Sequence, residues 1–189
     1  MYDFEKISAK LKDRIDAKRF RHTQGVHYTA MCLAMRYGCD IEKAGIAGLL
    51  HDCAKRLPDE EMIAVSLKGS LPVTDEEKAQ PFILHQKAGA VLAVSEYGIT
   101  DPEVLSAISC HTTGKPGMSL LDKIIFVADY IEPHRKMHDG LPEIRELAFK
   151  DLDAAVRVIL EHTVNYLKQN GKHVVQASYE SLAYYTNEQ

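Results

Sequence analysis

The chain has 189 residues, 46% of them hydrophobic and 26% charged, with a formal net charge of −4 at pH 7. These values are ordinary for a soluble globular protein, and the length suits one domain with a substantial core. No long Lys/Arg run, apolar signal core or membrane-length apolar run occurs, so we expect a cytoplasmic protein that binds neither nucleic acid nor membrane.

Helical periodicity runs through nearly the whole chain, and no convincing alternating strand pattern appears. In the first half, helices are predicted over about 3–16, 18–37 and 41–52, and a further helix starts near 58–61. Gly38 ends the second helix and Asp40 can cap the third, while Pro58 and the acids after it mark the next start. Residues 68–82 contain two prolines, so we expect a loop or a short helical turn there.

The second half continues the helical pattern. Helices are predicted at about 84–97, 102–111, 120–131, 142–149 and 152–170. Pro133 ends the third of these and Gly171 closes the last, after which the tail is expected to be a short docking segment. No internal repeat or linker appears. We therefore predict an all-α fold with one domain over 1–189, comprising a core of about 15–170 and a tail of 171–189.

Imidazoles and carboxylates stand at or near the ends of several predicted helices, in the order H…HD…H…H…D. Four imidazoles and two carboxylates are the right number and type of donors for one or two transition-metal ions, and a metal pair suits phosphate ester chemistry. The candidate metal ligands are His22, His51, Asp52, His85, His111 and Asp129.

The helical period gives directions for the first of these ligands. Since each residue advances by roughly 100°, His22 lies on the same stripe as Val26 and Leu33, whereas His27 faces elsewhere. The His51-Asp52 pair closes an apolar helix rich in small residues, which let neighbouring helices approach closely. The simpler alternatives are a hydrogen-bonded core histidine at position 22 and a dipole-complementing histidine at position 51.

The remaining ligands also lie on apolar stripes. His85 begins one helix and His111 ends the next. Asp129 follows the apolar run 124–128, and a carboxylate within a buried helix is costly unless it is paired or metal-bound. Metal binding is therefore favoured for Asp129, with a buried Asp–Arg or Asp–backbone pair as the alternative.

Several side chains near these ligands suit an anionic phosphate. Lys55 follows the His-Asp pair by one helical turn, which would bring its ammonium beside the site. Thr112 and Lys115 belong to a polar turn after the fourth histidine, and Arg135 follows the proline break. A solvated surface lysine and a simple helix stop are the alternatives for Lys55 and for the turn.

This arrangement resembles the HD-domain metal-dependent phosphohydrolases, an all-helical superfamily defined by H…HD…D. More closely, the chain is similar to the YqeK group of bacterial HD proteins over about residues 15–170. The matching segments are RFRHTQGV (19–26), LLHDCAKRLP (49–58), ILHQKAGA (83–90), ISCHTTGKPGMSLLDKIIFVADYIEPHR (108–135) and RELAFKDLDAAV (145–156). The resemblance implies a single HD-domain helical bundle with its metal site between helices.

The implied activity is symmetrical bis(5'-nucleosyl)-tetraphosphatase, which splits diadenosine tetraphosphate into two ADP. The resemblance adds His85 and His111 as ligands of a second metal to the basic four-ligand set, and it implies a dinuclear centre of iron, with manganese or cobalt compatible. Asp52 would bridge the ions, and a metal-bound hydroxide would attack an inner phosphate. Catalytic roles fall to Asp52 and Lys55, and substrate contacts to Lys55, Thr112, Lys115 and Arg135.

Other functions remain open at this stage, because HD folds support several chemistries. The chain could be an HD-type phosphatase or phosphodiesterase for another nucleotide, a di-iron oxygenase, or a non-catalytic nucleotide-sensing module. Lys55 and Arg135 argue against the oxygenase, and the complete ligand set argues against a decayed enzyme. A dinucleoside polyphosphate is the expected partner, and a homodimer is among the assemblies left open.

Overall fold

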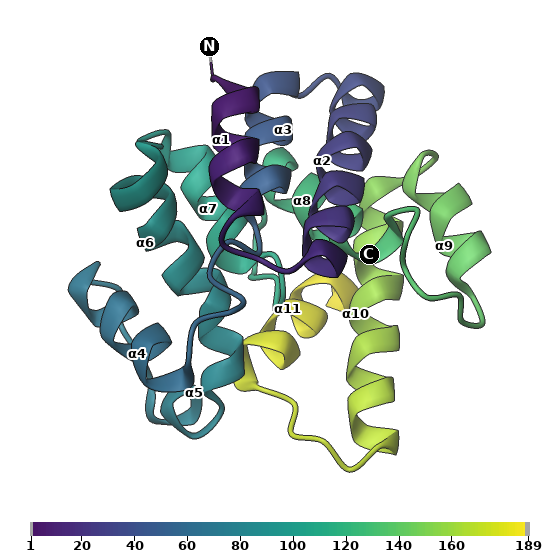
Figure 1. The fold of residues 1–189 in the computed structure, drawn as a ribbon. Helices are drawn as coiled ribbons and strands as arrows, with labels where there is room; N and C mark the ends of the chain where they lie inside the picture. Colours follow the sequence, from purple (N-terminus) through teal and green to yellow (C-terminus); the bar gives the residue numbers. More distant parts are fainter. Residues whose placement is uncertain (1, 188–189) are drawn as a thin grey trace.

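The computed structural model describes residues 2–187. This part of the chain forms eleven α-helices and one 3-10 helix, with no strand (Figure 1). In chain order they are α1 (Phe4–Lys12), α2 (Ala17–Tyr37), α3 (Ile41–Leu50), α4 (Asp59–Lys68), α5 (Asp75–Ala79), η1 (Pro81–Leu84), α6 (His85–Tyr97), α7 (Pro102–Cys110), α8 (Leu120–Ile131), α9 (Leu141–Ala148), α10 (Leu152–Gln169) and α11 (Gln176–Asn187). The predicted all-α fold class is confirmed.

Local capping explains where the long helices begin and end. Asp16 accepts a hydrogen bond from the Arg19 amide at the start of α2, and Gly38 ends that helix with φ of 72°. Asp40 caps α3 in the same way, as its position predicts. α8 ends at Ile131, before Pro133, because proline cannot continue a helix.

Two segments are more ordered than the sequence predicts. In the weak stretch 68–82, Thr74 and Glu77 form a capping box that starts the five-residue helix α5. The tail, expected as a short docking segment, contains the twelve-residue helix α11. This helix docks through Tyr185, which is buried and whose hydroxyl accepts a hydrogen bond from the Met118 amide at 2.9 Å.

The core is built around α8, which packs against α2, α3, α7 and α10 (Figure 1). Its residues Ile124, Ile125 and Val127 are fully buried, as expected for a helix that is apolar on most of its faces. Beside it, α3 approaches the backbone of α2 closely, since a Cβ at Gly48 would lie 3.1 Å from the His27 Cα. These contacts bring the carboxyl-terminal parts of α3, α7 and α8 to the same region as α2.

Replacing Ile124 with alanine should lower the free energy of unfolding by about 2–5 kcal/mol, because it removes buried methyl groups and leaves a cavity. Urea unfolding followed by circular dichroism measures this. The control is Leu120→Ala at the start of α8, where the side chain is 40% exposed and a much smaller change is expected. Equal losses for the two variants would contradict the central place of α8.

None of the helices in residues 2–187 combines the length and the apolar character that a membrane span requires.

Candidate metal centre

The six predicted ligands converge on one region. They come from α2, the turn after α3, the start of α6, the end of α7 and the last turn of α8. His51, Asp52, His85 and His111 are buried, and His22 and Asp129 are half-buried. Two overlapping triads bring their ligand atoms within 4.8 Å of one another, namely His22 with His51 and Asp129, and His51 with Asp52 and His111.

Backbone carbonyls orient three of the imidazoles. In each case Nδ1 lies within hydrogen-bond distance of the carbonyl three residues earlier, so Nδ1 carries the proton and Nε2 presents its lone pair. Two of these histidines follow helix ends, where carbonyls lack amide partners. The pairs are His51 with Gly48 (2.7 Å), His85 with Phe82 (2.7 Å) and His111 with Ile108 (2.8 Å).

Asp52 lies between two pairs of imidazoles. Its Oδ2 is 3.8 Å from Nε2 of His22 and 3.4 Å from Nε2 of His51. Its Oδ1 is 3.4 Å from Nε2 of His85 and 3.6 Å from Nε2 of His111. Within the pairs, the two Nε2 atoms are 3.3 Å and 3.2 Å apart. Each carboxylate oxygen therefore faces its own pair of imidazoles.

Asp129 lies beside the first pair of imidazoles, His22 and His51. Its Oδ1 is 3.1 Å from Nε2 of His22 and 3.9 Å from Nε2 of His51. The same oxygen accepts a hydrogen bond from Nη2 of Arg135 at 3.0 Å. Asp129 thus pairs with Arg135 and also faces two of the candidate imidazoles, so the two alternatives from the sequence do not exclude each other.

These donors fit divalent metal ions. Oδ1 of Asp52 is buried and has no hydrogen-bond partner among the described residues, which is costly for a charged oxygen. Imidazole nitrogens and carboxylate oxygens are common ligands of transition metals. The cluster is therefore suited to a metal site.

The electrostatic environment favours the ligating protonation states of Asp52 and His85. Burial raises the pKa of Asp52, but the neighbouring His51 and His111 imidazoles outweigh it and hold the pKa well below its usual value. Burial, with the neighbouring Lys55 and His111, lowers the pKa of His85 to about 3. Asp52 is therefore an anion and His85 a neutral base, the forms in which they bind metal.

Three basic side chains border the cluster. Nζ of Lys55 lies 2.9 Å from Nε2 of His85 and 3.7 Å from Oδ1 of Asp52, as its place one helical turn after the His51-Asp52 pair predicts. Arg135 contacts Asp129, as described. Arg19 contacts Oδ2 of Asp52 at 2.6 Å, and sequence reasoning missed it. The available signal was its place one helical turn before His22 on α2.

Of the polar residues in the turn after α7, Thr112 lies at the cluster and Lys115 does not. Thr112 lies beside the second imidazole pair, with its hydroxyl 3.0 Å from Nε2 of His85. The structure does not bring Lys115 to the cluster, because its ammonium pairs with the buried carboxylate of Asp122 at 3.0 Å. Gln86 is a second residue that the sequence analysis missed, and its side-chain oxygen accepts the Thr112 amide at 3.1 Å.

Two further residues define the edge of the site. His27 lies 2.7 Å from the Gly45 carbonyl through Nδ1 and takes no part in the cluster, as its direction on α2 predicts. Glu132 is buried, and its Oε1 lies 3.0 Å from Nδ1 of His22. This glutamate was not among the residues predicted from the sequence, although it follows Asp129 by one helical turn.

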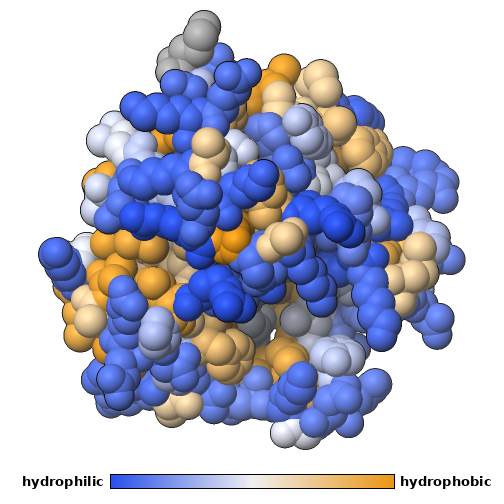
Figure 2. Space-filling model, in the orientation of Figure 1, coloured by the Kyte–Doolittle hydropathy of each residue, from blue (hydrophilic) through white to orange (hydrophobic). Residues whose placement is uncertain are grey.

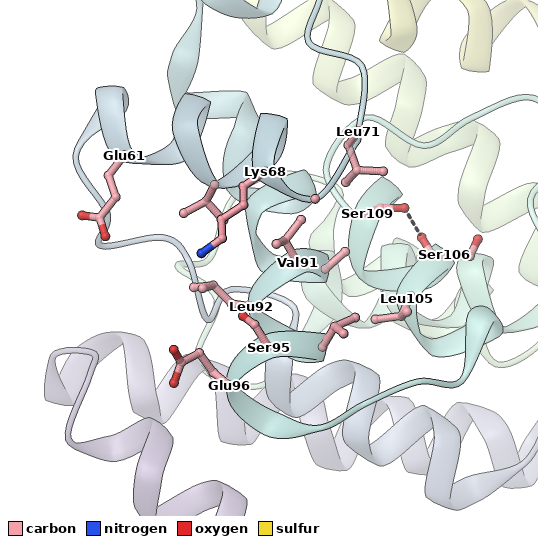
Figure 3. A pocket seen from close by; sticks show the side chains of 14 residues that line it. Glu61, Lys68, Leu71, Val91, Leu92, Ser95, Glu96, Leu105, Ser106 and Ser109 are labelled. Atoms are coloured by element: carbon pink, nitrogen blue, oxygen red, sulfur yellow. Dashed lines mark hydrogen bonds between the residues drawn. The ribbon is translucent and has the colours of Figure 1, made fainter.

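An apolar cavity lies apart from the cluster of predicted ligands. This cavity, of about 660 Å³, lies between α4, α6 and α7 and is lined by Val65, Val91, Leu92 and Leu105 among others (Figure 3). Apolar surface is visible over α6 on the left of Figure 2. None of the six predicted ligands lines the cavity.

Comparison with known proteins agrees with this geometry. Residues 19–134 match the family model of the HD domain. The chain is 40% identical over 170 residues to a symmetrical bis(5'-nucleosyl)-tetraphosphatase of Bacillus subtilis, covering 90% of each chain. It is 36% identical over 185 residues to a protein of the same name from Staphylococcus aureus, covering 97% of this chain and 94% of the relative.

A solved structure is also closely similar. It is the crystal structure of a predicted HD superfamily hydrolase involved in NAD metabolism from Clostridium acetobutylicum, with a TM-score of 0.96 and 40% identity, covering the whole of both chains. The segment that matches the HD domain contains all six residues that converge on the cluster.

Proposed function

The chain belongs to the HD-domain family, in the group of symmetrical bis(5'-nucleosyl)-tetraphosphatases, and from this premise we propose that it hydrolyses diadenosine tetraphosphate to two ADP. The observation that carries the proposal is the position of Asp52, with one carboxylate oxygen toward each pair of imidazoles. This arrangement suits two ions beside a polyphosphate.

We propose that the two ions are held by distinct ligand sets that share Asp52. His22, His51 and Asp129 would complete one set, and His85 and His111 the other. Iron is the expected metal, and manganese or cobalt would suit the same ligands. When bound, the ions would neutralise phosphate charge and supply a hydroxide from water near neutral pH.

The chain's own cations would bind and orient the phosphates. Lys55 and Arg135 border the two ligand sets, and Arg19 reaches the shared carboxylate from α2. Burial lowers the pKa of Lys55, and the nearby Asp52 partly offsets this effect. These side chains would stabilise charge on the phosphate oxygens, with the Thr112 hydroxyl as a further contact. Lys115 has no part in this proposal, since it pairs with Asp122.

The reaction breaks one bond in the middle of the polyphosphate chain. The hydroxyl of water joins one of the two inner phosphorus atoms, and the oxygen between them leaves with the other half. Because the leaving group is a nucleoside diphosphate, a weakly basic oxyanion, a strong general acid is not essential. Symmetrical cleavage requires the four phosphates to be held in one register across the cluster.

Product analysis tests this function. Purified protein supplied anaerobically with iron, manganese or cobalt should convert diadenosine tetraphosphate to ADP as the sole nucleotide product. AMP together with ATP as products would still show a hydrolase, but would contradict symmetrical cleavage. The absence of turnover with every metal would contradict the assignment, and a panel of mononucleotides and cyclic nucleotides would then identify an HD phosphatase or phosphodiesterase.

A further inference from the structure

We propose that Glu132 is a positioning residue that fixes the His22 imidazole for metal binding. The inference rests on the metal centre of the proposed function. Glu132 stands at the carboxyl end of α8 and is 1% exposed. Its Oε1 lies 3.0 Å from Nδ1 of His22, and its Oε2 accepts the His134 amide at 2.6 Å.

The charge of Glu132 has an unusual environment. Within residues 2–187, its ion-pair contact is with His22, and no lysine or arginine side chain lies within ion-pair distance of its carboxylate. A buried carboxylate is unfavourable unless its charge is compensated. A carboxylate that accepts Nδ1–H of a metal-ligating histidine is compensated through the imidazole, and it makes that imidazole a more basic ligand.

His22 needs such a partner because of its place in the fold. The other three imidazoles use backbone carbonyls at the ends of short helical segments. His22 lies inside α2, where the carbonyls of the preceding turn already accept hydrogen bonds from helix amides. An acceptor for its Nδ1–H therefore has to come from another helix, and Glu132 of α8 supplies it.

Gly25 provides the space for this contact. It lies three residues after His22 on α2, and a Cβ built there would come within 2.4 Å of Oε2 of Glu132. Glycine is otherwise unfavourable inside a helix. The carboxylate thus occupies the volume that any side chain at position 25 would fill.

Arg145 holds the backbone at the same point. From α9, its Nε donates to the Ile131 carbonyl at 2.9 Å and its Nη2 to the Glu132 carbonyl at 2.8 Å. These bonds satisfy carbonyls at the end of α8, where helix amides are lacking. A continuous series of contacts therefore runs from Arg145 through Glu132 to the imidazole of His22.

Glu132→Gln should weaken metal binding by about 10- to 100-fold without changing the number of ions bound. The two donors contact different carboxylate oxygens, and a glutamine replaces one of these oxygens by an NH₂ group that cannot accept. Calorimetric titration of metal-stripped protein with Mn²⁺ measures the affinity, and the absorption spectrum of the Co²⁺ form reports the coordination. Glu146→Gln on α9, where the side chain is 68% exposed, is the charge-matched control.

Gly25→Ala tests the same contact from the other side. It should weaken metal binding as Glu132→Gln does, whereas Gly45→Ala, at the packing of α3 against α1 and α2, should not. A Gly25→Ala/Glu132→Ala double variant should bind metal as Glu132→Ala alone does, since no carboxylate remains to be displaced. If the loss of metal affinity in the double variant equalled the product of the two single losses, the contact between Gly25 and Glu132 would be contradicted.

The outcomes separate this role from the metal centre itself. If the wild-type protein binds no metal, the proposed centre fails. If it binds metal and Glu132→Gln binds equally well, only the role of Glu132 is overturned. Loss of a whole metal equivalent in Glu132→Gln would also overturn it, because Glu132 would then be a ligand.

Discussion

Asp52→Asn should lower kcat for diadenosine tetraphosphate hydrolysis by about a thousandfold or more and should remove both metal equivalents. The reason is the position of the carboxylate between the two imidazole pairs, with an oxygen 3.4 Å from Nε2 of His51 and the other 3.4 Å from Nε2 of His85. A metal ion contributes several kcal/mol to charge stabilisation, and each 1.36 kcal/mol is tenfold in rate. Steady-state kinetics and metal content by elemental analysis measure both effects.

The asparagine variant keeps the volume of the side chain, so the fold should survive. Circular dichroism checks this, and Asp75→Asn is the control, because that carboxylate is 99% exposed at the start of α5. A protein that retained both ions after Asp52→Asn would contradict the bridging role. Retention of one ion would mean that Asp52 belongs to a single ligand set.

His111→Ala should leave one metal equivalent bound and lower kcat by about a hundredfold. We assign this imidazole to the second ligand set, since its Nε2 lies 3.2 Å from Nε2 of His85 and 3.6 Å from Oδ1 of Asp52. His22→Ala should likewise remove one ion, that of the first pair. Metal content and kinetics, measured on the same preparations, connect the loss of an ion to the loss of rate.

A surface histidine provides the control for these variants. His173 has a half-exposed side chain that contacts Glu76 at 2.7 Å, so His173→Ala should keep both ions and full turnover. Loss of both ions in His111→Ala would favour one strongly coupled site over two ligand sets. Unchanged turnover in His111→Ala would contradict the need for a second ion.

The sequence by itself determined most of the helices and the types of ligand. Helix bounds follow from local interactions, such as the capping of α2 by Asp16 and its termination at Gly38. The direction of His22 toward the buried stripe, and of His27 away from the cluster, follows from the helical period alone. For the same reason, the place of Asp129 on the apolar helix α8 could be predicted.

Only the tertiary structure decided which side chains meet. The helical period gives a direction around one helix axis, but the packing of α2, α3, α6, α7 and α8 sets the distances between groups on different helices. The contacts of Glu132 with His22 and of Arg19 with Asp52 join segments that are far apart in the sequence, so the pattern along one helix does not predict either contact. Lys115 pairs with Asp122 because a buried carboxylate is unfavourable without a compensating charge, and Asp122 becomes buried only when the helices pack.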